Sequence, residues 1–381
     1  MKALIDYIIS WLCYERPEAA KRVAYTDDLQ LLDRYDVLIQ PCGCLGGEPV
    51  VPDMQPAVVR QVAEGKYLIS TDIVYATFFF ASRAEELICK ERDEHGRFLA
   101  RHSLLGQDER LLCPLLDEYA GVLLQCLGEP LPAPGFAHVY LTHDVDSVSK
   151  YRSLRGTLGG FKRGEWRQVL QAWHDIRRDP HFTFPLLVEH DSRVSQAETV
   201  YFVKQTDGKG YDFPQYSLSG KDYKQLRQYV LDSGAKFGVH SSYYGCLPTR
   251  PLSHLHRSHY LNNPLPTMRQ LAEAGYTDDF SMGFADHAGF RLQTTRSVRW
   301  IDPERLRLTG LTLHPLTVMD TTLSAGNYMH LTEDEAFRLC RQLIAEVRRH
   351  HGEACLLWHN SNMDGTSYHQ SLYPKVLNLL K

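Results

Sequence analysis

The sequence contains no run of 18 consecutive apolar residues, so no transmembrane helix is expected. It also lacks a surplus of either charge, because 42 lysines and arginines stand against 46 aspartates and glutamates, a net charge of -4. This balance does not suggest a nucleic-acid-binding surface. Internal repeats and low-complexity tracts are absent, and a hydrophobic content of 43% is too high for a disordered chain. We therefore expect a folded protein with no nucleic-acid partner and no membrane span.

Paired cysteine motifs are also missing. The nine cysteines are odd in number, and only Cys42 and Cys44 lie close together. A C-x-C pair without a second pair is a weak zinc signal, so we expect mostly buried free thiols in a reducing cytoplasm. Asp6 interrupts the apolar start of the chain and no small-residue cleavage site follows, so a signal peptide is not expected. The predicted location is cytoplasmic.

The chain is longer than one hydrophobic core usually organises. Its 381 residues favour two domains, or one large α/β barrel with an attachment. Pro130, Pro132, Pro134 and Gly135 mark the best linker candidate. We predict an N-terminal α/β region over residues 1–135, with no assigned role, and a second domain over residues 136–381.

Strand and helix patterns alternate along the chain. Strands are predicted at 36–40, 139–141, 199–204, 236–240 and 355–359. Helices are predicted at 72–87, 111–126, 222–233 and 267–274, and from the Thr332–Glu335 capping box to Val347. Residues 150–164 are expected to form a loop or short helix over the site, and residues 185–189 a loop or strand edge. The alternation predicts a parallel α/β architecture.

Two aspartates directly follow the predicted strand at 139–141. In an extended backbone Asp144 and Asp146 point to the same side, so both can face one pocket. Two carboxylates this close repel each other unless a cation lies between them or one is protonated. The pair indicates a metal ligand beside a general base, or alternatively an Asp-rich turn.

Two further strands also end in polar side chains. His240 ends one and His359 ends another. The carboxyl ends of parallel strands in an α/β barrel meet at one rim, where sites are built. Asp146 and His240 suit a divalent ion such as zinc, which needs a third ligand. Candidates for it follow His240 in the chain: His254, His256 and His259.

At these residues the sequence resembles the polysaccharide deacetylase (NodB-homology, carbohydrate esterase) family. The resemblance is to a subgroup with a His-Asp-Val-Asp first motif and an extra N-terminal region. It covers about residues 137–381, and the matching motifs lie at 142–146, 238–243, 257–261, 281–291, 315–320 and 356–360. The N-terminal region also looks like the segment that precedes such domains, including residues 79–86 and 95–100.

The resemblance implies a fold and a set of roles. The fold would be α/β, a distorted parallel (β/α) barrel of NodB type with a smaller N-terminal α/β region. Asp146 and His240 would bind the metal, Asp144 would be the general base and His359 the general acid. Arg291 would pair with Asp144. From its place in the chain, we expect Asp320 to hold His359 in the required tautomer.

The sequence departs from the family pattern at one position. The family's second motif has two histidines four residues apart, and here position 244 is Tyr244. We take His259 as the substitute third ligand. The predicted function is removal of an N-acetyl group from an amino sugar in a glycan or glycan precursor, with a divalent metal, zinc first. The alternatives are hydrolysis of another non-peptide C–N bond and a non-catalytic carbohydrate-binding relative.

Overall fold

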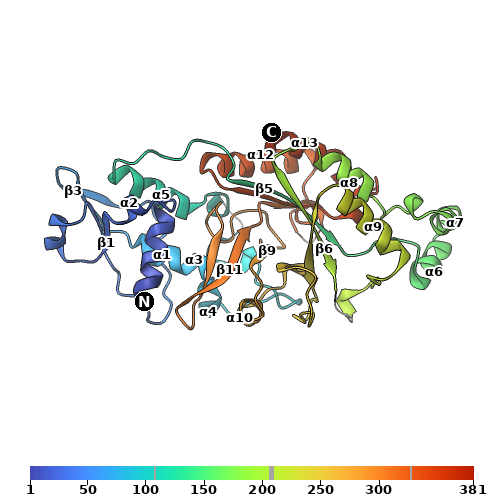
Figure 1. The fold of residues 1–381 in the computed structure, drawn as a ribbon, viewed down its shortest axis with the longest axis horizontal. Helices are drawn as coiled ribbons and strands as arrows, with labels where there is room; N and C mark the ends of the chain where they lie inside the picture. The colour runs from blue at the N-terminus through green and yellow to red at the C-terminus, as the bar shows by residue number, and fades with distance from the viewer. Residues whose placement is uncertain (107–108, 206–209, 327) are drawn as a thin grey trace.

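The computed structural model describes residues 1–106, 109–205, 210–326 and 328–381. Two β-sheets dominate it: a four-stranded sheet near the N-terminus and a nine-stranded sheet from the rest of the chain (Figure 1). Among the described residues, no helix is both long and apolar enough to cross a bilayer.

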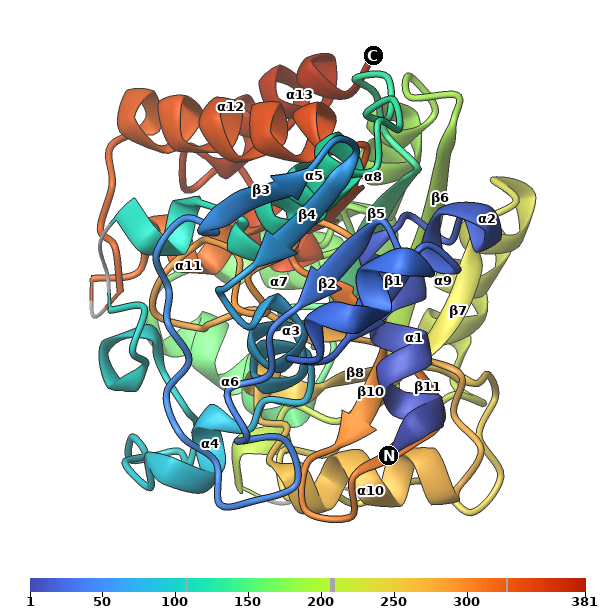
Figure 2. The same ribbon diagram turned by 90° about the vertical axis from the view of Figure 1, so that its left-hand side faces the viewer.

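The smaller sheet has the strand order β1-β2-β4-β3. Its strands are β1 (Val23–Tyr25), β2 (Val37–Ile39), β3 (Val59–Ala63) and β4 (Lys66–Ile69). β1, β2 and β4 are parallel, and β3 pairs antiparallel with β4. Figure 2 shows this sheet facing the viewer.

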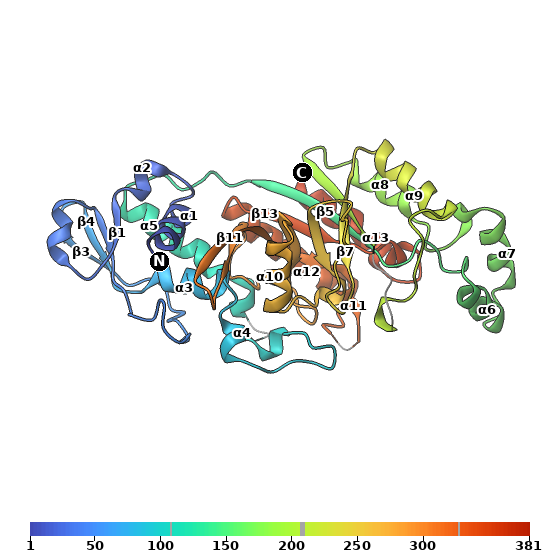
Figure 3. The same cartoon turned by 60° about the horizontal axis from the view of Figure 1, so that its bottom comes forward.

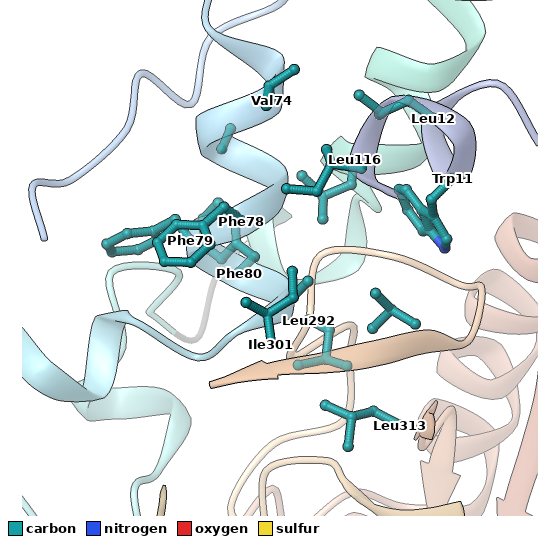
Figure 4. Close-up of a cluster of buried hydrophobic side chains, with 14 of the residues drawn as sticks. Trp11, Leu12, Val74, Phe78, Phe79, Phe80, Leu116, Leu292, Ile301 and Leu313 are labelled. Atoms are coloured by element: carbon teal, nitrogen blue, oxygen red, sulfur yellow. The ribbon is translucent and has the colours of Figure 1, made fainter. Parts of the chain in front are cut away.

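Three helices connect this sheet to the rest of the molecule. They are α1 (Lys2–Leu12), α3 (Ile73–Ala81) and α5 (Leu115–Cys126). Two short helices, α2 (Pro17–Ala20) and α4 (Glu85–Ile88), follow α1 and α3 in the chain. Every residue of α3 is buried, as expected for a helix that is apolar on all sides. Phe78, Phe79 and Phe80 lie in one core with side chains from α1, α5 and β10 (Figure 4).

The larger sheet has the order β10-β11-β9-β8-β7-β6-β5-β13-β12. Its strands are β5 (His138–Val145), β6 (Ala197–Lys204), β7 (Lys236–Ser241), β8 (Leu255–Ser258), β9 (Asp278–Met282), β10 (Val298–Asp302), β11 (Arg307–Pro315), β12 (Val318–Met319) and β13 (Glu353–Leu357). All neighbouring pairs are parallel except β10 with β11. The predicted parallel α/β architecture is therefore confirmed.

Helices pack against this sheet. A second core joins its strands to α8 (Phe184–Asp191), α9 (Lys221–Asp232), α12 (Glu333–Arg349) and α13 (His369–Leu377). α10 (Leu265–Glu273) packs in the core that contains Phe78, Phe79 and Phe80, and α11 (Asp320–Ser324) follows β12. The predicted capping box is present, because Thr332 and Glu335 hydrogen-bond each other's backbone at the start of α12.

The larger sheet is strongly curled. Contacts between side chains of strands that are far apart in the strand order show this curvature. His314 of β11 lies between Asp278 of β9 and Glu353 of β13, at nitrogen–oxygen distances of 2.9 and 2.8 Å. The rings of Tyr140 on β5 and Phe280 on β9 have centroids 5.2 Å apart, although three strands separate β5 from β9. In the described part of the chain, β10 and β12 end the hydrogen-bonded order, so the closed barrel stays a prediction.

The buried His314 is expected to make stability depend on pH. Burial lowers its pKa, but the hydrogen bonds to Asp278 and Glu353 outweigh burial and raise the pKa to about 9. Because the pKa of His314 is higher in the folded state than in the unfolded state, the protonated side chain stabilises the fold. This contribution to the free energy of unfolding is fully present below about pH 6.5 and is lost as the pH rises through about 9. We expect His314→Gln to lower the free energy of unfolding by on the order of 2 kcal/mol at pH 6 and by clearly less above pH 9, in urea titrations. The same change at the exposed His138 is the control, and an equal loss from His314→Gln at both pH values would contradict the assignment.

Some local predictions were wrong. Residues 150–164 contain a short helix, α6 (Leu154–Lys162), which was one of the predicted alternatives, but α6 pairs with α7 (Trp166–His174) at one end of the molecule and does not line the pocket of the site (Figures 1 and 3). Residues 185–189 lie in α8, because Pro185 occupies the first turn of a helix, where its missing N–H costs nothing. The nine cysteines are free, but only Cys13, Cys340 and Cys355 are buried.

Candidate active site

Strand β5 places the two aspartates. Thr142 and Asp144 point into the curled sheet, where both contact Arg257, whereas His143 points outward to the Asp191 carboxylate and the Trp358 carbonyl. Asp146 follows the strand, and both aspartates line the same pocket. The period of two along a strand therefore brings the carboxylates to one side, as the sequence predicted.

Asp146, His240 and His259 lie close together at the carboxyl ends of β5, β7 and β8. The Asp146 Oδ1 atom is 3.3 Å from His240 Nε2 and 3.2 Å from His259 Nε2. One possible ligand atom from each of the three residues lies within 4.8 Å of the other two. The three side chains predicted to share a metal are thus brought together.

The other ring nitrogen of each histidine is fixed by a hydrogen bond. His240 Nδ1 donates to the Arg257 carbonyl at 3.0 Å, and His259 Nδ1 donates to Asp212 at 2.9 Å. Because a carbonyl only accepts, His240 Nδ1 must carry a proton, which makes Nε2 the ring nitrogen that faces Asp146 and could bind a metal. Metal-binding histidines are typically oriented this way by a second hydrogen bond.

Two of the atoms that could bind a metal have no hydrogen-bond partner among the described residues. Asp146 Oδ1 and His240 Nε2 are buried atoms that make no hydrogen bond in the part of the chain that the structure describes, although they lie 3.3 Å from each other. Buried polar atoms are normally satisfied, so such a pair needs a partner. A carboxylate oxygen and two imidazole nitrogens are ligands that zinc accepts with one position left for water. The residues therefore fit a divalent metal.

The electrostatics of the cluster point the same way. Burial raises the pKa of Asp146, but the neighbouring His259 and His240 outweigh it and hold the pKa well below its usual range. Burial lowers the pKa of His259, but Asp146 and Asp212 outweigh that effect and raise it. The site thus keeps a negative carboxylate and attracts positive charge, which a bound cation supplies in place of the histidine proton.

A second cluster of potential ligands has a different character. Glu118, Glu346 and His350 also lie within 4.8 Å of one another. Arg349 already pairs with both carboxylates, at 2.7 Å from Glu346. Since a guanidinium neutralises this group, we assign no metal to it.

Asp144 has a different arginine partner from the one predicted. Arg257 Nη1 lies 3.2 Å from Asp144 Oδ1, and its side chain is fully buried inside the sheet. Arg291 instead pairs with Glu86 at 2.8 Å and donates to the Gly283 carbonyl. The predicted pairing of Arg291 with Asp144 was therefore wrong. The Arg291 guanidinium also stacks on the Phe284 ring, 5.1 Å from the ring centroid.

Asp320 and His359 form a close pair on the other side of the pocket. Asp320 Oδ1 accepts from His359 Nδ1 at 2.7 Å, and Asp320 Oδ2 accepts from the His359 backbone N–H at 2.7 Å. Burial lowers the pKa of His359, but Asp320 outweighs burial and raises it to about 10. Burial raises the pKa of Asp320, but His359 outweighs that and lowers it to about 2. His359 therefore carries its second proton at neutral pH, on Nε2, 3.8 Å from Asp146 Oδ2.

A pocket of about 280 Å³ joins these groups. Asp144, Asp146, His259 and His359 line it, and the other lining residues are aromatic, polar or aliphatic: Arg97, Lys204, Tyr211, Phe213, Tyr260, Leu261, Met319, Thr321, Tyr328, Ser361 and Asn362. Arg97 comes from the N-terminal region. Its guanidinium pairs with Asp93 at 2.8 Å and donates to the Tyr328 hydroxyl at 3.0 Å.

Sequence reasoning missed four of the groups that build this site. Lys204 ends β6 and donates to the Asp146 carbonyl, so the rule of polar residues at strand ends would have found it. Arg257 lies on β8, in the motif at 257–261, but its type and position alone do not indicate that it pairs with Asp144. Asp212 and Arg97 carry no sequence signal, because each reaches the site through a loop. Tyr244, the substitution in the second motif, is 54% exposed and does not line the pocket.

Comparisons with known proteins cover different parts of the chain. A family described as "Family of unknown function (DUF7033)" matches residues 7–132. No curated protein matches this chain. A crystal structure from Mycobacterium smegmatis, provisionally assigned as a polysaccharide deacetylase, is similar at 13% identity with a TM-score of 0.41. That match covers 65% of this chain and 87% of the other.

Proposed function

We propose that this chain is a metal-dependent hydrolase that removes an N-acetyl group from an amino sugar in a glycan or glycan precursor. One observation carries the proposal. Asp146 Oδ1 and His240 Nε2 lack a hydrogen bond and lie beside His259, and the pocket lined by Asp146 and His259 is also lined by the Asp144 carboxylate and a protonated His359. Amide hydrolysis needs these components: an activated water, a base and an acid for the leaving amine.

Asp146, His240 and His259 are the residues that would hold the metal. A divalent ion, with zinc the first candidate, supplies Lewis acidity that makes water a nucleophile near neutral pH and polarises a carbonyl. Asp212 and the Arg257 carbonyl orient the two imidazoles toward it. Lys204 Nζ, 3.7 Å from Asp146 Oδ1, adds positive charge at the edge of the group.

Asp144 is the proposed general base. It is buried next to the cluster, with Oδ2 3.7 Å from His240 Nε2, and among the described residues only Arg257 hydrogen-bonds to its side chain. Arg257 fixes one carboxylate oxygen, which leaves the other to accept the proton of the attacking water.

His359 is the proposed general acid. Its Nδ1 proton is held by Asp320, so the Nε2 proton faces the pocket and is available to the leaving nitrogen. An amine leaves an amide poorly unless it is protonated, and a histidine kept cationic by a buried carboxylate can provide that proton.

The walls of the pocket favour a sugar as substrate. Tyr211, Phe213, Tyr260 and Tyr328 offer aromatic faces for the C–H side of a pyranose ring, and Arg97 and Asn362 offer hydrogen-bond donors for its hydroxyls. The volume of about 280 Å³ is at the lower end of ligand pockets, which suits one sugar unit.

The test is acetate release from a panel of N-acetylated amino-sugar oligomers, with N-acetylated amino acids and other simple amides alongside. Acetate should appear from the sugars only, stop after dialysis against a chelator and return when zinc is added. Release from the simple amides alone would favour a different C–N substrate. Sugar binding without any release by the metal-loaded protein would contradict the proposal and leave a carbohydrate-binding protein.

A further inference from the structure

The hairpin of α6 and α7 carries an apolar face that nothing in the described chain covers. Its large side chains are 48% to 80% exposed: Leu154, Leu158 and Phe161 on α6, and Trp166, Leu170 and Trp173 on α7. On each helix they follow the spacing i, i+4, i+7, which puts them on one side. Figures 1 and 3 both show the hairpin projecting at the end of the molecule opposite the N-terminal sheet.

The helices that carry these exposed side chains are packed against each other and against the rest of the protein. The hairpin has its own small core of Tyr151, Val169 and Ala172. Gly160 is buried against it, and a Cβ atom at Gly160 would lie 2.5 Å from Val169. Arg152 pairs with Asp222 of α9 at 2.8 Å, which ties the hairpin to the larger sheet's helices. The apolar side chains therefore point outward although the helices are properly packed.

Basic residues flank the apolar face. Arg155 and Lys162 follow the first and last apolar residues of α6, and Arg167 and His174 take the same two places on α7. Residues 150–179 contain eight arginines and lysines but three carboxylates, a surplus of five positive charges in a chain of net charge -4. Positive charge is thus enriched in the stretch of chain that carries the exposed apolar residues.

We propose that the α6–α7 hairpin docks on the surface of a lipid bilayer that contains anionic phospholipid. Tryptophan and leucine side chains suit the boundary between headgroups and acyl chains, and flanking arginines and lysines pair with lipid phosphates. A second copy of the chain fits this face poorly, because it would bring two positive rims together.

The hairpin lies on the bilayer and does not cross it. Each helix has nine residues, which gives a length of about 13 Å, well short of the roughly 30 Å hydrocarbon core. The hairpin begins eight residues after Asp146, at the carboxyl end of β5, so the bilayer contact is at the same end of that strand as the candidate site. The inference rests on this surface alone and holds whatever reaction the site performs.

Vesicle flotation tests the proposal. The full-length protein is mixed with vesicles of phosphatidylcholine alone, or of phosphatidylcholine with phosphatidylglycerol at about a third of the lipid. We expect binding to the anionic vesicles at least about tenfold tighter than to the neutral ones, and weakened by salt. Trp166 and Trp173 are the exposed tryptophans, so their emission should shift to shorter wavelength on binding.

Matched variants locate the contact. Leu158→Gln with Leu170→Gln should weaken binding to anionic vesicles by about tenfold or more. Val58→Gln with Leu231→Gln changes two apolar residues that are 59% and 46% exposed elsewhere, and should leave binding unchanged. Absence of flotation with both vesicles, or equal binding by both double variants, would overturn the proposal. So would dimerisation that the hairpin variant removes while vesicles do not bind, since a second copy would then cover the face.

Discussion

Asp144→Asn is expected to reduce amide hydrolysis by about 10³-fold or more while the protein keeps its metal. The amide is close in size to the carboxylate and can still accept from Arg257, so the fold should persist. It cannot take the proton of the attacking water. The measurement is kcat for acetate release together with metal content per chain.

Asp146→Asn is the matched control, because the same chemical change is made two residues along the chain. It replaces a proposed ligand, so metal content and activity should fall together. If Asp144→Asn also loses the metal, Asp144 belongs to the coordination shell and is not the free base.

The second large effect is expected at His359. His359→Ala should lower kcat by about 10²- to 10⁴-fold with unchanged metal content, because the leaving amine loses its proton donor. The loss should shrink for substrates with better leaving groups, which need less help from an acid. Equal losses for an amide and an activated ester would show that His359 positions the substrate instead.

The same assignment predicts a shift in the pH profile. Activity should fall at high pH as His359 loses its proton, and Asp320 raises the pKa of His359 to about 10 in the absence of metal. Asp320→Asn removes that charge, so the pKa falls and the alkaline limb of kcat/KM moves to lower pH. If the alkaline limb of Asp320→Asn lies at the same pH as that of the unchanged protein, the limb does not report deprotonation of His359.

The sequence predicts this site well where the chemistry follows from strand geometry. Asp144 and Asp146 share a side because side chains alternate along β5, and His240 and His259 reach them because parallel strands end at one rim. The Thr332 capping box was predicted from a short pattern and the close Asp320–His359 pair from the place of Asp320 in the chain, and both are present in the structure.

Other features depend on contacts that no local pattern encodes. Arg257 and Arg291 are both motif arginines, and only the curl of the sheet decides that Arg257 points inward to Asp144 while Arg291 meets Glu86. The helix expected at 72–87 is interrupted because Arg83 adopts a left-handed backbone and its side chain pairs with Glu86. Asp212 and Arg97 enter through loops, whose paths are set by tertiary packing.

The most direct test of the account is the position of the metal. Crystals of the protein loaded with zinc should give an anomalous difference peak at the zinc edge, about 2.0–2.2 Å from Asp146 Oδ1, His240 Nε2 and His259 Nε2. The same peak should vanish in His259→Ala crystals grown at equal zinc concentration. A peak that persists without His259, or that lies only at Glu118 and His350, would contradict the proposed metal site and the hydrolysis built on it.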